Sequence, residues 1–359
     1  MQEIREKILI NTNDFLREKF SKINFKENKV LVFNDVVKEY DLLRYGTGIR
    51  VLSSKAILKL EGKDSLDFLH RISTNDVKTL ELNQIKDTIF TNEKGRILDF
   101  TKLINTEKGI YLIGGLNNNN ILESWLNRYI IMEDIKVTDV TDEYIFLEFF
   151  GTQAESFLIM QCGKLISDSE EHSFHSIEFL GKKVYFYKNL LPNGQFKFTI
   201  IINNGDIVEV IEQLIKDESV FDYGFVGDEA YDIFRIENMI VRFPNEINHN
   251  VNPHEVELLD AVSFTKGCYI GQEVIARLDT YDKVQRVLKR FQFDENVVVD
   301  SLPFEIFNKN DEESGFITSY INSDLLKKNI GLALVRKKNI DEDLFIINGK
   351  DKVKLNFNR

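Results

Sequence analysis

The chain has 359 residues, of which 43% are hydrophobic and 29% charged, so it is globular and long enough for two or three domains. Its formal net charge of −12 opposes binding to nucleic acid or to an anionic membrane unless a local basic patch overcomes it. The only two cysteines, Cys162 and Cys268, exclude a disulfide framework and fit a reducing compartment. No apolar run is long enough to cross a bilayer, and no signal peptide is visible, so we expect a cytoplasmic protein.

The first half of the chain alternates strand and helix signals. Apolar spacing predicts helices at 4–20, 64–69 and 121–131. Short apolar runs predict strands at 29–33, 51–60, 88–91, 96–100, 109–113, 136–140 and 144–150. Between 51 and 140 strands and helices alternate in an order typical of a split βαβ, ferredoxin-like unit.

The second half is expected to continue as α+β and to end in β-structure. A helix over 154–162, a β-rich stretch over 173–202 and helices over 206–216 and 227–237 come first. The chain then has short β runs at 304–307, 315–320, 331–335 and 344–347. Their spacing predicts a small all-β terminal domain.

One segment, residues 266–273, carries the most specific chemical signal, KGCYIGQE. The residues after it can form an amphipathic helix, which would place Cys268 just before, or in, its first turn. A helix N-terminus and an adjacent lysine, Lys266, both favour a thiolate over a thiol. The alternative is a buried structural cysteine in a glycine-rich turn.

This motif resembles the signature of the YgfZ family, folate-binding proteins related to the glycine-cleavage T-protein, an aminomethyltransferase. Other segments similar to that family follow in the expected order: STND at 73–76, TNEKGRILD at 91–99, RIE at 235–237, NPHE at 252–255, and two terminal β runs. The resemblance extends from about Tyr40 to the C-terminus.

The resemblance implies a three-subdomain cloverleaf around a hole that holds tetrahydrofolate. It divides the chain into an N-terminal extension (1–39), a folate-binding region of two interleaved subdomains (40–285) and a C-terminal β-barrel (286–359). It also implies a role in iron–sulfur cluster assembly or repair, in some members linked to tRNA modification, with iron–sulfur client or assembly proteins as partners. Catalytic roles are expected for Cys268 and Lys266, and no resident metal is expected. Folate contacts are expected from Asn92, Asp99, Tyr111, Arg235, Gly267, Tyr269, Gly271, Gln272, Glu273 and Arg277.

Three departures distinguish this sequence from T-proteins. The T-protein Asp-Asp pair is Asp99-Phe100 here, and the glutamate of a Gly-Tyr-Thr-Gly-Glu stretch is missing from the comparable residues 191–196. T-proteins also have an aspartate where Cys268 stands. All three point away from ordinary aminomethyl transfer and toward the cluster-maintenance branch.

Three functional hypotheses therefore remain open. The first is a tetrahydrofolate-binding accessory protein for iron–sulfur clusters that uses Cys268. The second is a folate-dependent aminomethyl- or methyltransferase, which needs a carboxylate for proton transfer, and Asp99 is its visible remnant. The third is a nucleic-acid module, for which the support is a basic cluster made of Lys283, Arg286, Lys289 and Arg290. For three expected contacts the alternatives are structural, namely helix N-terminal capping by Gln272 and Glu273 and a surface ion pair of Arg235.

Overall fold

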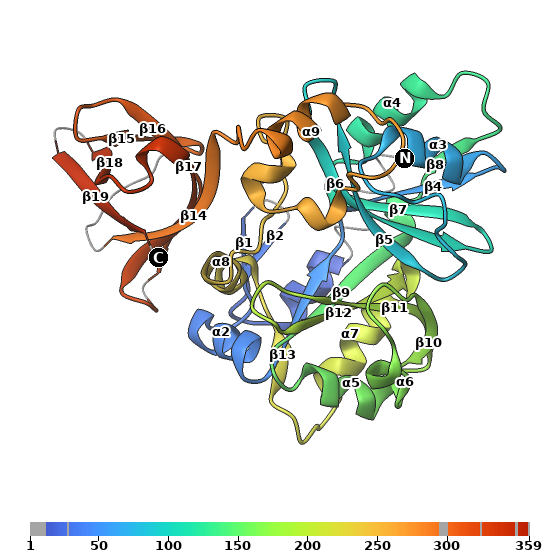
Figure 1. Cartoon of the computed structure of the whole chain (residues 1–359). Coiled ribbons are helices and arrows are strands. Elements are labelled where there is room, and N and C mark those ends of the chain that lie inside the picture. The colour runs from blue at the N-terminus through green and yellow to red at the C-terminus, as the bar shows by residue number, and fades with distance from the viewer. Residues whose placement is uncertain (1–11, 27–28, 294–300, 324, 349–350, 358–359) are drawn as a thin grey trace. The chain divides into compact units, whose positions relative to one another are not determined.

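The computed structural model describes residues 12–26, 29–293, 301–323, 325–348 and 351–357. The chain forms two compact units, each built from several chain segments. Unit 1 comprises Met1–Ser65, Leu80–Lys86 and Lys102–Phe234, and unit 2 comprises Leu66–Thr79, Asp87–Thr101 and Arg235–Arg359. Figure 1 shows the mixed helices and strands that were expected.

A six-stranded sheet is the centre of unit 1. Its strand order is β10-β11-β12-β9-β3-β13, and all neighbours are antiparallel except β13 beside β3. The strands are β3 (Thr47–Leu52), β9 (Tyr144–Phe150), β10 (His175–Phe179), β11 (Lys182–Leu190), β12 (Phe196–Asn203) and β13 (Tyr223–Phe225). This sheet positions most of the polar groups of unit 1 described below.

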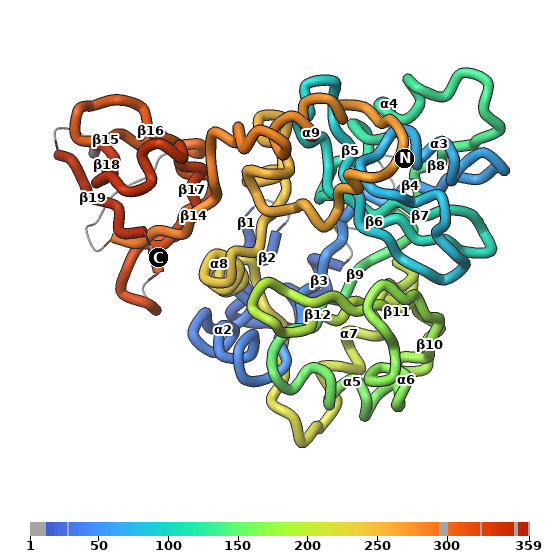
Figure 2. Tube along the Cα trace, viewed as in Figure 1, coloured from blue at the N-terminus to red at the C-terminus, as the bar shows by residue number. Residues whose placement is uncertain are grey.

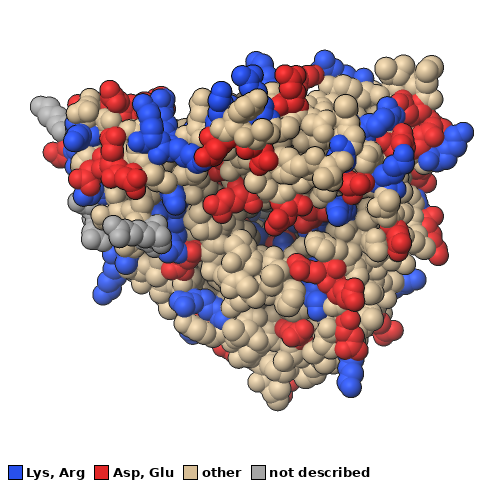
Figure 3. All heavy atoms as spheres, in the orientation of Figure 1, with Lys and Arg blue, Asp and Glu red and all other residues tan. Residues whose placement is uncertain are grey.

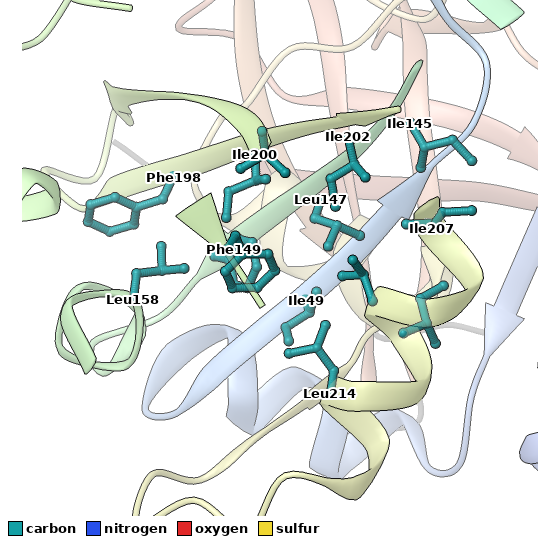
Figure 4. Packing of buried hydrophobic residues seen from close by; sticks show 14 of the residues in the cluster. Ile49, Ile145, Leu147, Phe149, Leu158, Phe198, Ile200, Ile202, Ile207 and Leu214 are labelled. Carbon is teal, nitrogen blue, oxygen red and sulfur yellow. The ribbon is translucent and has the colours of Figure 1, made fainter. Parts of the chain in front are cut away.

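One face of that sheet is covered by two helices, α5 (Ala154–Cys162) and α7 (Ile207–Lys216). Alternate residues of the strands, such as Ile49, Leu147 and Ile200, pack against them, as Figure 4 shows. The helix expected over 206–216 is confirmed, and the residues expected to point inward are buried, namely Ile207, Val210, Ile211 and Leu214. The short helix α6 (Leu165–Asp168) follows α5.

A second, five-stranded sheet has the order β5-β6-β7-β4-β8. Its elements are β4 (Lys55–Glu61), α3 (Ser65–Ile72), β5 (Ile85–Thr91), β6 (Ile97–Thr106), β7 (Gly109–Leu116), α4 (Asn119–Tyr129) and β8 (Lys136–Asp139). The order β6-β7-β4-β8 is that of the expected ferredoxin-like unit, with β5 added at one edge. A single strand was expected over 51–60, and this is wrong. A bend at residues 53–54 separates β3, which belongs to the six-stranded sheet, from β4, which belongs to the five-stranded sheet.

The last strands close into a barrel of order β14-β17-β16-β15-β18-β19, which confirms the expected small terminal β domain. The strands are β14 (Arg286–Phe293), β15 (Phe304–Asn308), β16 (Glu313–Ser323), β17 (Lys328–Arg336), β18 (Leu344–Asn348) and β19 (Asp351–Phe357). Figure 2 follows the chain from α9 (Gln272–Thr280) through β14 into the barrel. The sequence analysis assigned no strand to β14 or β19, because neither contains a continuous apolar run.

The remaining elements are short. Residues 12–19 are helical, and the rest of the helix expected over 4–20 is mostly outside the described residues. The strands β1 (Asn24–Lys26) and β2 (Lys29–Val32) form a hairpin, followed by α2 (Val36–Arg44). The helix α8 (Asp228–Glu237) ends unit 1 and begins unit 2. Among the described helices, none has both the length and the apolar character needed to cross a membrane.

Candidate functional site

Cys268 lies in a loop that precedes α9. The N-cap of α9 is Gly271, so the cysteine is three positions before the cap and not in the first helical turn. Its side chain is exposed, which rules out the alternative of a buried structural cysteine. Cys162, by contrast, is half-buried at the end of α5, and burial raises the pKa of its thiol to about 12.

Lys266 binds the end of helix α3. Its ammonium donates hydrogen bonds to the backbone carbonyls of His70, Ser73 and Asn75, the last two at 2.7 Å. A lysine has three N–H donors, so all of them are used. Burial lowers the pKa of this ammonium to about 8, against the opposite effect of Asp76. Lys266 therefore attaches the loop to the end of α3. Its expected effect on the ionisation of the Cys268 thiol stays a prediction.

The motif packs tightly on the turn between β5 and β6. The hydroxyl of Thr91 donates to the carbonyl of Ile270 at 2.6 Å. Gly271 has a φ of +83°, and a Cβ built on it would lie 2.6 Å from the carbonyl oxygen of Asn92. Both the conformation and the close approach therefore require glycine at this position. Around Gly267, in contrast, a Cβ would meet no heavy atom within 4 Å.

The remaining motif residues divide into buried and exposed positions. Tyr269 is buried, and this burial raises the pKa of its phenol to about 12. The side-chain nitrogen of Lys266 lies 5.3 Å from the centre of the Tyr269 ring. The Gln272 amide reaches back to the carbonyl of Gly267 at 3.5 Å. Glu273 and Arg277 are exposed on α9, so neither is committed to the protein core.

Three of the expected folate contacts outside the motif, Asn92, Asp99 and Tyr111, lie in the β5–β6 turn, on β6 and on β7. The side chain of Asn92 accepts hydrogen bonds from the backbone N–H groups of Lys94 and Arg96 and so stabilises its own turn. Asp99 is buried in β6, with 1% of its surface exposed. Asn92 and Asp99 belong to unit 2, whereas Tyr111 on β7 belongs to unit 1. Tyr111 there lies edge-to-face with Tyr144.

A surface ion pair was the alternative for Arg235, and this is wrong because only 1% of the residue's surface is exposed. Its guanidinium lies 3.4 Å from the carboxylate of Glu246 and donates to the hydroxyl of Ser319 at 2.8 Å. Glu246 is fully buried and also accepts from Thr318 and Ser319 of β16. These bonds join α8 to the barrel within unit 2, so the described role of Arg235 is structural.

The basic cluster proposed for nucleic acid is largely committed to other groups. Arg286 binds the carboxylate of Glu255 at 2.7 Å, and Arg290 donates to the backbone carbonyl of Glu237. Lys283 is exposed and Lys289 is half-buried in β14. Such internal pairing weakens the case for a phosphate-binding stripe.

Sequence reasoning missed a row of charged residues on the second face of the six-stranded sheet. Glu148 of β9 pairs directly with Arg50 of β3 and with Thr199 of β12 across the strands. Its carboxylate accepts from Lys197 at 2.8 Å and from Lys55 at 3.3 Å, and Arg50 lies 3.5 Å away. We call Arg50, Lys55, Glu148 and Lys197 the charged row. The alternation of buried apolar and polar residues along these strands is the signal that could have revealed it.

The charged row has an excess of positive charge. Burial opposes ionisation of Glu148, but Lys197, Lys55 and Arg50 outweigh it and hold the pKa of this carboxyl far below its usual range. Arg50 also binds Asp228 at 2.7 Å and lies 3.5 Å from the ring centre of Tyr231. Three cations thus face two carboxylates, and the side chains of Lys55 and Lys197 keep 19% and 16% of their surface exposed.

Two polar atoms beside the charged row lack a partner among the described residues. They are Oγ1 of Thr199, which is buried opposite Glu148, and Oδ1 of Asn189, which lies opposite Lys197. Buried polar groups are normally hydrogen-bonded, and exceptions often mark a site that a ligand or water completes. The charged row and these two polar atoms are therefore suited to a ligand that carries negative charge and further polar groups.

Comparison with known proteins gives a family match, similar sequences and a similar structure. A family model described as the GCVT N-terminal domain matches residues 15–266. The chain is similar to the aminomethyltransferase of Staphylococcus carnosus, with 24% identity over 85% of this chain and 83% of that protein. It is likewise similar to that of Caldanaerobacter subterraneus subsp. tengcongensis, with 26% identity over 85% and 81%. Glycine cleavage system aminomethyltransferase T from Bartonella henselae shares the fold, with a TM-score of 0.80, 18% identity, and 94% and 93% of the two chains covered.

Replacement of Gly271 by alanine is expected to lower the free energy of unfolding by about 1–2 kcal/mol or more, because an L-residue is strained at its φ and the new Cβ overlaps the Asn92 carbonyl. Gly267→Ala is the matched control, since it adds the same methyl group to open space. Urea denaturation of both variants measures the difference. Equal stabilities of the two variants would show that the motif is not packed against this turn.

Replacement of Glu148 by glutamine is expected to lower the free energy of unfolding by about 3–5 kcal/mol, because it leaves buried cations uncompensated. The folded-state pKa of Glu148 lies below its ordinary value of 4.5, so its contribution is present above pH 4.5 and is lost as the pH falls through the folded value. The acid limb of a stability–pH curve should therefore be flatter in Glu148→Gln. Glu178→Gln, an exposed position of β10, serves as the control and should retain the wild-type curve. An acid limb unchanged in Glu148→Gln would contradict the account.

Proposed function

The chain belongs to the GCVT N-terminal domain family, and from that premise we propose that it binds tetrahydrofolate and transfers a one-carbon unit. The aminomethyltransferases to which it is similar along more than four-fifths of its length support the transfer reaction. The cofactor expected from the sequence, tetrahydrofolate, is the one that this family implies.

The charged row is the observation that carries folate binding. Tetrahydrofolate ends in a glutamate with two carboxylates, and a site for it needs cations that are not fully neutralised. Lys55 and Lys197 are such cations, because they share Glu148 with Arg50 and retain exposed surface. Thr199 and Asn189 offer the polar atoms that a ligand rich in amide and amine groups can satisfy.

When bound, tetrahydrofolate supplies the amine nitrogens that accept the one-carbon unit. Within the chain, Lys55 and Lys197 would bind carboxylate oxygens, while the Asn189 side-chain oxygen would accept from an N–H group of the ligand. From the sequence resemblance we take Asp99 as the carboxylate of the transfer, because a proton must leave the accepting nitrogen. Its burial would maintain the carboxylate in one position.

Asp99→Asn is expected to lower kcat by about a hundredfold or more, because a positioned acid–base group contributes at least that factor. The assay measures formation of methylene-tetrahydrofolate by the pure protein from an aminomethyl donor. Asp168→Asn, an exposed change on α6, is the control. Lack of turnover by the wild-type chain would overturn the transferase proposal, and an unchanged kcat in Asp99→Asn would remove the role of this residue.

The exposed thiol of Cys268 favours a second candidate function. By the resemblance described in the sequence analysis, T-proteins have an aspartate at this position, and the family model ends at residue 266, before the cysteine. We therefore retain the narrower likeness to the YgfZ branch as a proposal. In that role the protein would bind tetrahydrofolate and assist iron–sulfur client or assembly proteins, with Cys268 as nucleophile or transient ligand.

Cys268→Ala and Cys268→Asp separate the two functions. If the thiol serves cluster maintenance, both variants lose activity of iron–sulfur enzymes in cells, while the stability and tetrahydrofolate affinity of the pure protein stay unchanged. If the chain is an ordinary transferase, Cys268→Asp retains or increases methylene-tetrahydrofolate formation. Full complementation by Cys268→Ala in cells would exclude the cysteine-dependent role.

A further inference from the structure

Unit 2 contains a large pocket that neither the motif nor the charged row explains. Its volume is about 1330 Å³, and it lies among the β5–β6 turn, the segment 244–255, the start of β14 and the β16 and β17 side of the barrel. Amide side chains contribute much of the polar lining, including Asn245, Asn248 and Gln285. The positively charged lining residues are Lys94, Arg96, Arg286, Arg336, Lys337 and Lys338. Only two carboxylates, Glu255 and Glu313, lie among the lining residues.

Two guanidinium groups are fixed in this pocket by one buried carboxylate. Arg286 binds Glu255 with two bonds of 2.7 and 3.0 Å, and Arg96 binds the same side chain at 3.1 Å. Both also donate to the backbone carbonyl of Asn250. Because one carboxylate neutralises only one of the two arginines, this pair keeps a net positive charge. In the described contacts Arg96 uses only its Nη1, which leaves Nε and Nη2 for a ligand.

The other cations add to this charge. Arg336 is balanced by Glu313 at 2.8 Å, and Lys337 by Asp282 at 2.7 Å. Lys94 and Lys338 are exposed, and within the described part of the chain no carboxylate pairs with either ammonium. The arginine pair and these two lysines leave an excess of about three positive charges in a protein whose formal net charge is −12.

We propose that this pocket binds a small phosphate-bearing polyanion with three or four negative charges. Guanidinium groups held in a fixed orientation match the oxygens of phosphate, and flexible lysines add point charges at the rim. An oligophosphate carries more charge per length than a polycarboxylate, which suits a pocket whose excess is about three positive charges. The inference does not depend on the proposed folate function.

An oligonucleotide is a weaker candidate for the same charges. Figure 3 shows acidic and basic side chains interspersed over the face it displays, without a continuous basic stripe. With the overall negative charge, that surface repels a long phosphate backbone. A short ligand that enters the pocket avoids most of this repulsion.

Isothermal titration of the full chain with inorganic tripolyphosphate tests the proposal. The wild type is expected to bind with a Kd on the order of micromolar, and affinity should fall as salt is added. Lys94→Ala/Lys338→Ala should bind at least about tenfold more weakly, because each removed lysine contributes a direct charge contact. Both lysines are exposed, so the fold is expected to be retained.

Lys38→Ala/Lys309→Ala is the matched control, since it removes two exposed lysines that do not line the pocket and changes the net charge equally. It should bind within about twofold of wild type. Citrate in place of tripolyphosphate should bind at least about tenfold more weakly. The proposal is overturned if tripolyphosphate shows no saturable binding, if both double variants lose affinity equally, if citrate binds as well, or if a single-stranded oligonucleotide binds more tightly.

Discussion

The buried carboxylate of Glu148 is the group on which the polar half of unit 1 depends. A carboxylate with 3% of its surface exposed is stable in its charged form only when cations surround it, and here they come from β3, β4 and β12. Lys55 belongs to the five-stranded sheet and Lys197 to the six-stranded one, so the interaction joins the two sheets. Because side chains alternate along a strand, a slip of one residue would place Leu147 on this polar face and Glu148 in the apolar core. The register of the central strands and the charged row thus depend on each other.

A comparable constraint governs the cysteine motif in unit 2. Lys266 anchors the segment to the end of α3, and Gly271 allows it to approach the β5–β6 turn closely. With these two residues committed to structure, Cys268 is held on a fixed loop while its side chain remains exposed. The residues that identify the motif therefore position the thiol, and Cys268 is the residue for which we propose a chemical role.

Much of the fold could be predicted from the sequence, because apolar spacing reports on packing within an element. The helix 207–216, the β5–β6 turn and most barrel strands follow from such spacing. Alternation along the strands marks the polar positions of one sheet face, but it does not show that Arg50, Lys55, Glu148 and Lys197 meet, since they are far apart in sequence. Arg235 shows the same limit, because its buried partners Glu246 and Ser319 lie in other segments. Motif resemblance identified the folate family but not the cations that would bind the cofactor.

The central claim is that tetrahydrofolate binds through the excess positive charge of the charged row. The most direct measurement is an anaerobic calorimetric titration of the full chain with tetrahydrofolate, repeated on a folded Lys197→Met variant. The account predicts saturable binding by the wild type with a Kd on the order of micromolar and at least about tenfold weaker binding by the variant. Absence of binding by the wild type, or equal affinity of the two proteins, would contradict it.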